Sequence, residues 1–452
     1  MPEQQQHSEQ LLTRRELFSA LPQAAALGGA LAAAGAAAAL SGCSSEKEDT
    51  TIDVLEVALN DVETLDSYSL MDDEEEHYTL TDIVTLPGGS QLFSSDGACA
   101  AVMMTGETAS PLTVVKLLDL ATGTTSDALN QAVGQEDGFN IIDVRGSSTL
   151  LVWVENNFLT DDWHVYAAAV SSSIETESEV VRNYYAETDP TTGDVTHGYN
   201  DETVTHEKTI YALGTPVLLD SGDADYDIPE IAVAGGLAYW IVQPSEDGTK
   251  TDEDSYLRTS NGAATAANAY TSHGRFCGGL SVSADMVCAL PRVDSASSVY
   301  YQLSAFSGGS MVASQILPHS YRPNTAIYLD GSFSFGINGS YDYGDGIANV
   351  GTYYPLDDGK WLRLIREPVT PLGSCQGWLY CKSGARTVFV DAKRERYFTI
   401  NPPSDSQDHG DYTVQLGAVG CLYNYATVNT LEDGESGTSV VVRRIDLESI
   451  NQ

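Results

Sequence analysis

The chain has 452 residues and a formal net charge of −42, from 22 Lys and Arg against 64 Asp and Glu. Such an excess of acidic residues disfavours binding to nucleic acid or to an anionic lipid surface, because both require basic patches. The length suffices for one large all-β domain or for two ordinary domains.

The first element is a targeting segment. Arg14 and Arg15 form a basic pair that Leu17 and Phe18 follow, and residues 21–40 are an uncharged run rich in Ala and Gly. A basic stretch before an apolar stretch is typical of an export signal. The adjacent arginines with Leu-Phe resemble a twin-arginine translocation signal, which exports folded proteins.

The stretch "LSGC" at residues 40–43 resembles a bacterial lipobox. This resemblance implies that residues 1–42 are a signal peptide and that Cys43 receives lipid and becomes the mature N-terminus. Acyl chains on Cys43 would hold the protein at the outer face of the cell membrane. Residues 43–77 are then the lipidated Cys and an acidic tether. An Ala-rich transmembrane anchor and a cleaved soluble signal are the alternatives.

The remaining sequence is all-β in pattern. Short runs of Val, Ile, Tyr and Ala alternate with clusters of Gly, Ser, Asp and Asn, as expected for strands and tight turns. Phe276, Asn324 and Leu372, which precede three of the turns, are spaced by 48 residues. A period in this range with only strands in each unit indicates propeller blades. The predicted hairpins lie at 93–104, 143–154, 232–242, 282–290, 328–337, 382–390 and 416–425.

A further strand is expected after each hairpin. These third strands are predicted at 114–123, 164–172, 254–262, 299–309, 349–359, 395–403 and 441–449. Seven hairpins and seven third strands predict a seven-bladed β-propeller over residues 78–450, with six or eight blades as alternatives. The chain ends after the last third strand, so an N-terminal strand is expected to complete the last blade, either 78–86 or 51–59. The sequence resembles secreted β-propellers in architecture, without a repeated Trp-Asp ending.

One segment interrupts the period, and we predict an insertion at residues 171–213. It carries Tyr184, Tyr185, His197, Tyr199 and His206, which are candidate ligand-binding residues for a sugar, a peptide or a cation. Long insertions in propellers are a common location of binding sites. Packing of the loop against itself is the alternative.

Basic residues concentrate near residues 360–396 of this acidic chain. Arg363, Arg366, Arg386, Arg394 and Arg396 are the candidates for a partner or anion patch. The alternative is that they pair with neighbouring carboxylates.

The sequence contains no GxSxG, HExxH or phosphate-binding glycine loop. No catalytic residue and no cofactor is therefore assigned. The Asp-rich turns at 221–227 and 341–346 are candidates for a Ca²⁺ site, because carboxylate and carbonyl oxygens are the ligands of this ion. Six cysteines follow Cys43, and they are either free and packed as apolar residues or paired as disulfides. They are Cys99, Cys277, Cys288, Cys375, Cys381 and Cys421.

These observations favour a membrane-anchored, extracytoplasmic lipoprotein whose propeller binds a ligand or a protein rather than an enzyme. The expected partner is a protein, a peptide or a glycan, and nucleic acid is excluded. The alternatives are an enzyme acting on glycans or similar polymers, with residues converging in the propeller funnel, and an envelope assembly scaffold.

Overall fold

The computed structural model describes most of the chain after the targeting segment. The described residues are 53–55, 61–71, 76–108, 110–188, 190–246, 248–263, 265–283, 285–294, 298–319, 321–337, 351–364, 373–383, 386–403, 412–416, 421–432 and 435–450. The targeting residues Arg14, Arg15 and Cys43 and the basic residue Arg366 lie outside them.

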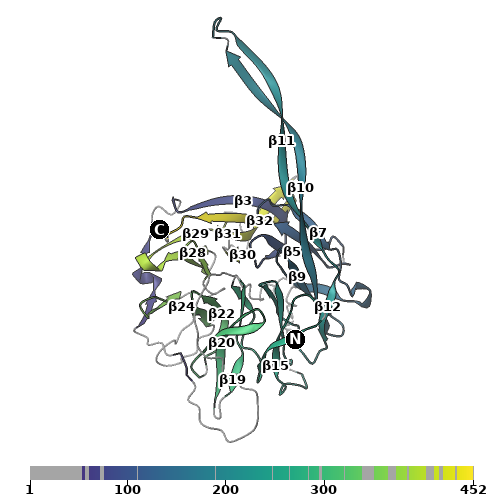
Figure 1. Ribbon diagram of the computed structural model, residues 1–452, viewed down its shortest axis with the longest axis vertical. Coiled ribbons are helices and arrows are strands. Elements are labelled where there is room, and N and C mark those ends of the chain that lie inside the picture. The colour runs from purple at the N-terminus through teal and green to yellow at the C-terminus, as the bar shows by residue number, and fades with distance from the viewer. Residues whose placement is uncertain are drawn as a thin grey trace, which may run out of the picture.

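Seven sheets surround a common centre when the molecule is viewed down its shortest axis (Figure 1). We number them blades 1 to 7 in chain order, starting with the sheet of β4. From the inner strand outward, blade 1 consists of β4 (Gln91–Phe93), β5 (Cys99–Thr105), β6 (Thr113–Asp119) and β7 (Thr125–Leu129). Blade 2 consists of β8 (Asn140–Gly146), β9 (Leu150–Asn157), β10 (Asp162–Thr188) and β12 (Val217–Gly222), and β11 (Val195–Leu213) also pairs with β10. Blade 3 consists of β13 (Ile231–Ala234), β14 (Leu237–Val242), β15 (Ser255–Ser260) and β16 (Ala267–Ser272).

Blades 4 to 7 continue the ring. Blade 4 consists of β17 (Ser281–Ser283), β18 (Met286–Ala289) with β19 (Arg292–Asp294), β20 (Val299–Ser307) and β21 (Ser310–Ile316). Blade 5 consists of β22 (Pro323–Leu329), β23 (Ser332–Ile337), β24 (Gly351–Pro355), β25 (Trp361–Leu364) and β1 (Val62–Thr64), and blade 6 of β26 (Gly373–Cys375), β27 (Trp378–Ser383), β28 (Arg386–Asp391), β29 (Arg396–Ile400) and β2 (Ser69–Leu70). Blade 7 consists of β30 (Tyr412–Leu416), β31 (Cys421–Glu432), β32 (Glu435–Leu447) and β3 (Tyr78–Pro87). The 3₁₀ helices η2 (Leu65–Ser67), η4 (Gln135–Asp137) and η5 (Ala392–Arg394) lie between strands. The seven-bladed prediction is confirmed.

Tight turns join the first and second strands of several blades. Gly235 and Gly236 connect β13 to β14 with φ of 56° and 73°, and Asp330 and Gly331 connect β22 to β23 with φ of 48° and 85°. Two consecutive positive φ angles match the right-handed twist of the strands in a two-residue hairpin, and glycine adopts them without steric cost.

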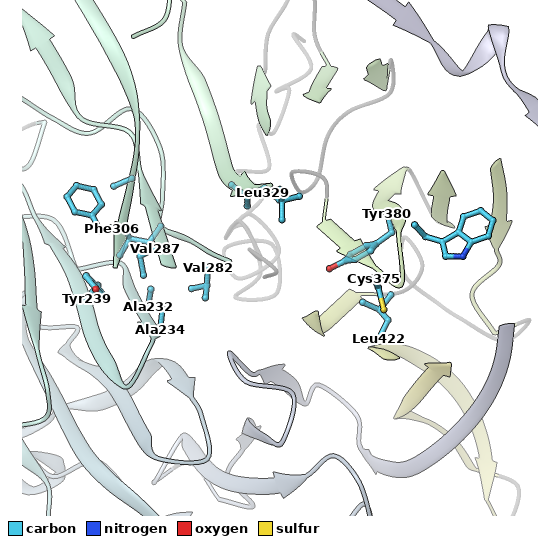
Figure 2. Packing of buried hydrophobic residues seen from close by; sticks show 14 of the residues in the cluster. Ala232, Ala234, Tyr239, Val282, Val287, Phe306, Leu329, Cys375, Tyr380 and Leu422 are labelled. Atoms are coloured by element: carbon cyan, nitrogen blue, oxygen red, sulfur yellow. The ribbon is translucent and has the colours of Figure 1, made fainter. Parts of the chain in front are cut away.

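A buried apolar cluster lies between each blade and the next. Separate clusters join blades 1 and 2, 2 and 3, 4 and 5, and 5 and 6. The largest cluster runs through blades 3 to 7, from Tyr239 and Phe306 to Tyr380 and Leu422 (Figure 2). Burial of these interfaces removes apolar surface from water, which is the main favourable term in folding.

The ring closes between its last and first blades. β3 pairs antiparallel with β32 from Tyr78 opposite Leu447 to Pro87 opposite Ser439. A further apolar cluster joins blade 7 to blade 1, and the inner strands β30 and β4 are in contact. Of the two predicted closing strands, 78–86 therefore completes blade 7.

The segment before β3 also belongs to the ring. Val54 forms a parallel bridge with Ile316 of blade 4, β1 adds a parallel strand to β25 of blade 5, and β2 adds one to β29 of blade 6. We call residues 53–55 and 61–71 the belt. For the belt residues the expected tether is thus corrected, because they pair with the outer edges of three blades, whose backbone groups would otherwise be free. Residues 43–52 lie outside the described residues.

Blade 6 differs from the prediction by one strand. Residues 395–403 were expected as its third strand, but β29 is the fourth and β28 is the third. The unpredicted hairpin is β26 to β27, whose turn residues Gln376 and Gly377 have φ of 54° and 89°. Its first strand has three residues and its turn starts with Gln, so neither feature is conspicuous in the sequence.

Candidate binding surfaces

The predicted insertion forms a long two-stranded ribbon, which we call the arm and which comprises residues 170–188 and 195–213. The register is unbroken from Val170 opposite Leu213 to Thr188 opposite Val195. The 19 residues of β11, at about 3.3 Å each, give a length of about 60 Å. The arm projects away from the ring (Figure 1).

The base of the arm is anchored in the ring. Val170 and Tyr211 are buried in the cluster between blades 1 and 2. The backbone N–H of Tyr211 donates a hydrogen bond to Oγ of Ser126 in β7, at 3.0 Å. These contacts set the direction in which the ribbon leaves the ring.

One face of the arm is apolar. Directly opposed residues of an antiparallel pair share a face, and the face alternates along each strand. Five of the six large exposed apolar side chains on the arm therefore share the face that we call the apolar face: Ile174, Val180, Tyr184, Val195 and Tyr199. Between Ile174 and Val195 the register places nine further residues on this face: Thr176, Ser178, Arg182, Ala186, His197, Asp201, Thr203, Thr205 and Glu207. Three of these are charged, Arg182, Asp201 and Glu207. Arg182 and Asp201 pair with each other at 2.8 Å, so the pair is neutral and Glu207 adds one negative charge to this face.

The opposite face is acidic. It carries Glu175, Glu177, Glu179, Glu187 and Glu202, whose positions alternate with those of the apolar face. Lys208 lies 3.2 Å from Glu177 and His206 lies 3.3 Å from Glu179. The arm is therefore amphipathic, with an acidic face behind an apolar face.

The five predicted ligand-binding residues divide between these two faces. Tyr184, His197 and Tyr199 gather on the apolar face near the tip, where the Tyr184 ring stacks at 5.6 Å on His197 and meets Tyr199 edge-on at 5.7 Å. The Tyr184 hydroxyl and His197 Nδ1 are also hydrogen-bonded. Tyr185 covers Gly198 on the acidic face, which also holds His206. The structure thus brings together three of the five.

Two of the four described residues of the predicted basic patch are neutralised by ion pairs. Arg394 and Arg396 each bond to Oδ2 of the buried Asp391 at 3.0 Å. Arg363 lies on β25 beside the belt, and Arg386 is exposed at the start of β28. These positions fit the alternative of local pairing for Arg394 and Arg396.

A carboxyl cluster that the sequence did not indicate lies near the inner strands of blades 2 to 4. Asp143 is paired with Arg145 on β8, and the Arg145 guanidinium lies 4.1 Å from the centre of the Phe93 ring. Glu230 accepts a hydrogen bond from the backbone N–H of Leu280 at 3.2 Å. Burial raises the pKa of both carboxyls above their ordinary values. The residues converge from separate blades, so no sequence spacing reveals them.

No group of three or more His, Cys, Asp or Glu side chains is arranged for a metal ion within the described ranges. In the turn at 221–227, Asp225 pairs with Lys250 at 3.5 Å, and Asp227 pairs with Arg275. The turn at 341–346 lies outside the described residues. Among the helices that the structure describes, none is long and apolar enough to cross a membrane.

The six cysteines after Cys43 are free thiols, and five of them are buried. The interpretation as small apolar side chains therefore describes this structure, and the disulfide alternative does not.

Comparisons with known proteins give structural likenesses only. No protein family matches the sequence, and no curated protein matches it. A prolyl endopeptidase structure aligns with a TM-score of 0.44 and 9% identity, over 81% of this chain and 50% of the endopeptidase chain. A puromycin hydrolase structure aligns with a TM-score of 0.43 and 11% identity, over 79% of this chain and 51% of the hydrolase chain. The sialidase of Trypanosoma rangeli aligns with a TM-score of 0.34 and 14% identity, over 84% of this chain and 58% of the sialidase chain. The chain spans about half the length of the first two, and at these identities the comparisons assign it no activity.

Proposed function

We propose that this chain is an exported, lipid-anchored β-propeller that binds a protein partner of the cell envelope through the arm. The observation that carries the proposal is the apolar face of the arm, which leaves Ile174, Val180 and Tyr199 between 66% and 70% exposed. An isolated two-stranded ribbon is marginally stable in water, so a surface that covers this face would stabilise it.

The two faces define the chemistry of the partner. The apolar face favours an uncharged apolar surface on the partner. The glutamates on the opposite face favour basic residues of the partner beside that apolar surface. A second copy of this chain fits less well, because its net charge of −42 would oppose association.

The size of the apolar face reaches the lower limit for a specific complex. About 15 residues per strand span about 50 Å, and two strands are about 10 Å wide. One face thus offers about 500 Å², so a complex would bury about 1,000 Å² in total, the lower bound for a specific interface. Contacts with the strand edges would add to this area, because each arm strand has one edge outside the β10–β11 pairing.

Membrane anchoring in this proposal rests on the sequence of residues 40–43. Cys43→Ser is expected to abolish incorporation of a labelled fatty acid, and Arg14→Lys with Arg15→Lys is expected to retain the precursor in the cytoplasm. Labelling of the Cys43→Ser protein would contradict the assignment.

The arm is tested by shortening it. A variant in which Asn-Gly joins Ser173 to Ile210 keeps the anchored base and closes the ribbon with a favoured hairpin turn. We expect light scattering of the detergent-extracted protein to give a complex heavier than the monomer, and the shortened variant to give the monomer alone. A mass of two copies, or a complex that survives shortening, would contradict the proposed partner.

A hydrolytic activity is the second candidate, favoured by the raised pKa of Asp143 and Glu230. A carboxyl with a raised pKa can act as a general acid near neutral pH. Assays on glycan and peptide substrates would test it, with Glu230→Gln expected to abolish any turnover. Turnover that persists in that variant would exclude this pair as its source.

A further inference from the structure

A cleft of about 1200 Å³ lies between blades 5 and 6. Its walls come from the turn between β24 and β25, the turn between β26 and β27, the residues around η5, and the belt. It is remote from the arm, which leaves blade 2. The belt contributes Glu63 and Tyr68, so this wall exists only because the N-terminal segment packs on the ring.

Tyr68 lines this cleft and lacks a hydrogen-bond partner. Its side chain is 7% exposed, and its hydroxyl is buried without a partner among the described residues. A buried hydroxyl without a partner is costly and unusual in folded proteins. Burial, together with Glu63 and Glu395 nearby, raises the pKa of Tyr68 to about 12, so the hydroxyl keeps its proton at neutral pH. The four charged residues that act on this hydroxyl, Glu63, Glu395, Asp358 and Lys360, all line the cleft, so we infer that the hydroxyl is directed toward the cleft.

The lining of the cleft is acidic beyond its internal pairs. Lys360 pairs with Glu63 and, at 3.5 Å, with Asp358, and Arg394 pairs with Asp391. The charged lining residues outside these pairs, within the described ranges, are Asp330, Asp357, Lys393 and Glu395. Three carboxylates therefore face one ammonium group.

A second tyrosine lies beside two of these carboxylates. Tyr354 lines the cleft, and burial with Asp330 and Asp357 raises its pKa to about 12. An aromatic ring next to carboxylates is a favourable environment for a cation, which interacts with the ring face and with the negative charges together.

We propose that this cleft binds a ligand that carries ammonium or guanidinium groups, with Tyr68 hydrogen-bonding to it and with Asp330, Asp357 and Glu395 pairing with its charges. The volume exceeds that of an ordinary small-molecule pocket, so the ligand is an extended one with several cationic groups. A basic peptide and a polyamine share this chemistry, and a nucleotide or an acidic glycan does not. The proposal is independent of the function assigned to the arm.

The test is calorimetric titration of the purified mature protein with tetralysine amide, with spermine and with tetraglutamate. At least one of the two cationic probes is expected to bind, with an affinity that falls as the salt concentration is raised. Tetraglutamate is expected not to bind. Binding of tetralysine alone would identify a peptide site, and binding of spermine alone a polyamine site. Absence of binding by both cationic probes, or equal binding of tetraglutamate, would overturn the proposal.

Variants connect the binding to these residues. Tyr68→Phe is expected to weaken the Kd about fivefold, the effect of one hydrogen bond, while the melting temperature of the free protein stays the same or rises. Asp357→Asn with Glu395→Gln is expected to weaken it about tenfold or more. The matched control removes two charges from an exposed turn of blade 2, Glu136→Gln with Asp137→Asn, and should change the Kd less than twofold. An unchanged Kd in Tyr68→Phe, or an equal loss in the blade 2 control, would contradict the assignment.

Discussion

Asp391 shows how single residues hold this fold together. Its side chain is 1% exposed, it accepts bonds from the side chains of Arg394 and Arg396, and it caps η5 by accepting from the backbone N–H of Arg394. Although burial raises the pKa of its carboxyl, the two guanidinium groups outweigh burial and hold that pKa below its ordinary value. One carboxylate thus orders the turn that forms a wall of the cleft.

Asp391→Asn is expected to lower the free energy of unfolding by about 2 kcal/mol at pH 7, because it leaves two partly exposed guanidinium groups unpaired. Because the folded pKa is depressed, the stabilisation is present above the unfolded pKa of about 4 and is lost as pH falls through the folded value. Urea denaturation between pH 3 and 7 should therefore show the two proteins converging below about pH 4. Asp137→Asn, at an exposed position, is the control, and a difference that grows with acidity would contradict the account.

The cysteines give a second prediction at this scale. Burial raises the pKa of the Cys288, Cys375 and Cys381 thiols to about 12. Thiolate is the reactive form, so the folded protein should react slowly with a thiol reagent at pH 8 and all six thiols should react after unfolding. Fewer than six thiols in the unfolded, unreduced protein would instead indicate a disulfide.

At the scale of elements, the sequence predicts strands best where the turn and the buried strand after it are both regular. The 78–86 strand alternates and lies as predicted on the last blade, whereas β26 is too short to show a period. The belt was missed for a related reason, because β1 has three residues and β2 has two. They are strands because they pair with blade edges far away in the sequence, and no local pattern marks them. The cleft they help to form could not have been predicted either.

The N-terminal segment gives a prediction for these elements. Starting the chain at residue 77 removes the belt and keeps β3, and we expect a lower melting temperature with one cooperative transition. Starting it at residue 88 also removes β3, which leaves the cluster between blades 7 and 1 without Leu86 and Val84. That protein should fail to fold cooperatively by circular dichroism and calorimetry. Equal melting temperatures for the two proteins would show that β3 does not close the ring.

The arm is an element whose pattern was visible only in part. Its aromatics were identified in the sequence, but its division into faces depends on the register of β10 against β11, which pairs residues up to 43 positions apart. A shift of one residue between the strands would mix the two faces. The unbroken register is therefore what creates the apolar surface.

At the scale of the whole molecule, the ring and the arm are built differently. Seven blades, each joined to the next by a buried cluster, form the base, and the closing strand pairs residues 78–87 with 439–447. Because these closing contacts join the two ends of the domain, they are expected to form slowly, and a ring that is not yet closed exposes unpaired strands. In the proposed function, export after folding keeps these strands covered. The arm then presents its apolar face at a distance from this base.

The most direct test of the central claim is photo-crosslinking in intact cells from single positions along the arm, 178 to 184. If a partner covers the apolar face, crosslinks to a second protein should alternate, strong from positions 178, 180, 182 and 184 and weak from 179, 181 and 183, since successive residues of a strand point to opposite faces. Crosslinks of equal strength from both sets, or none from either, would contradict binding through the apolar face of the arm.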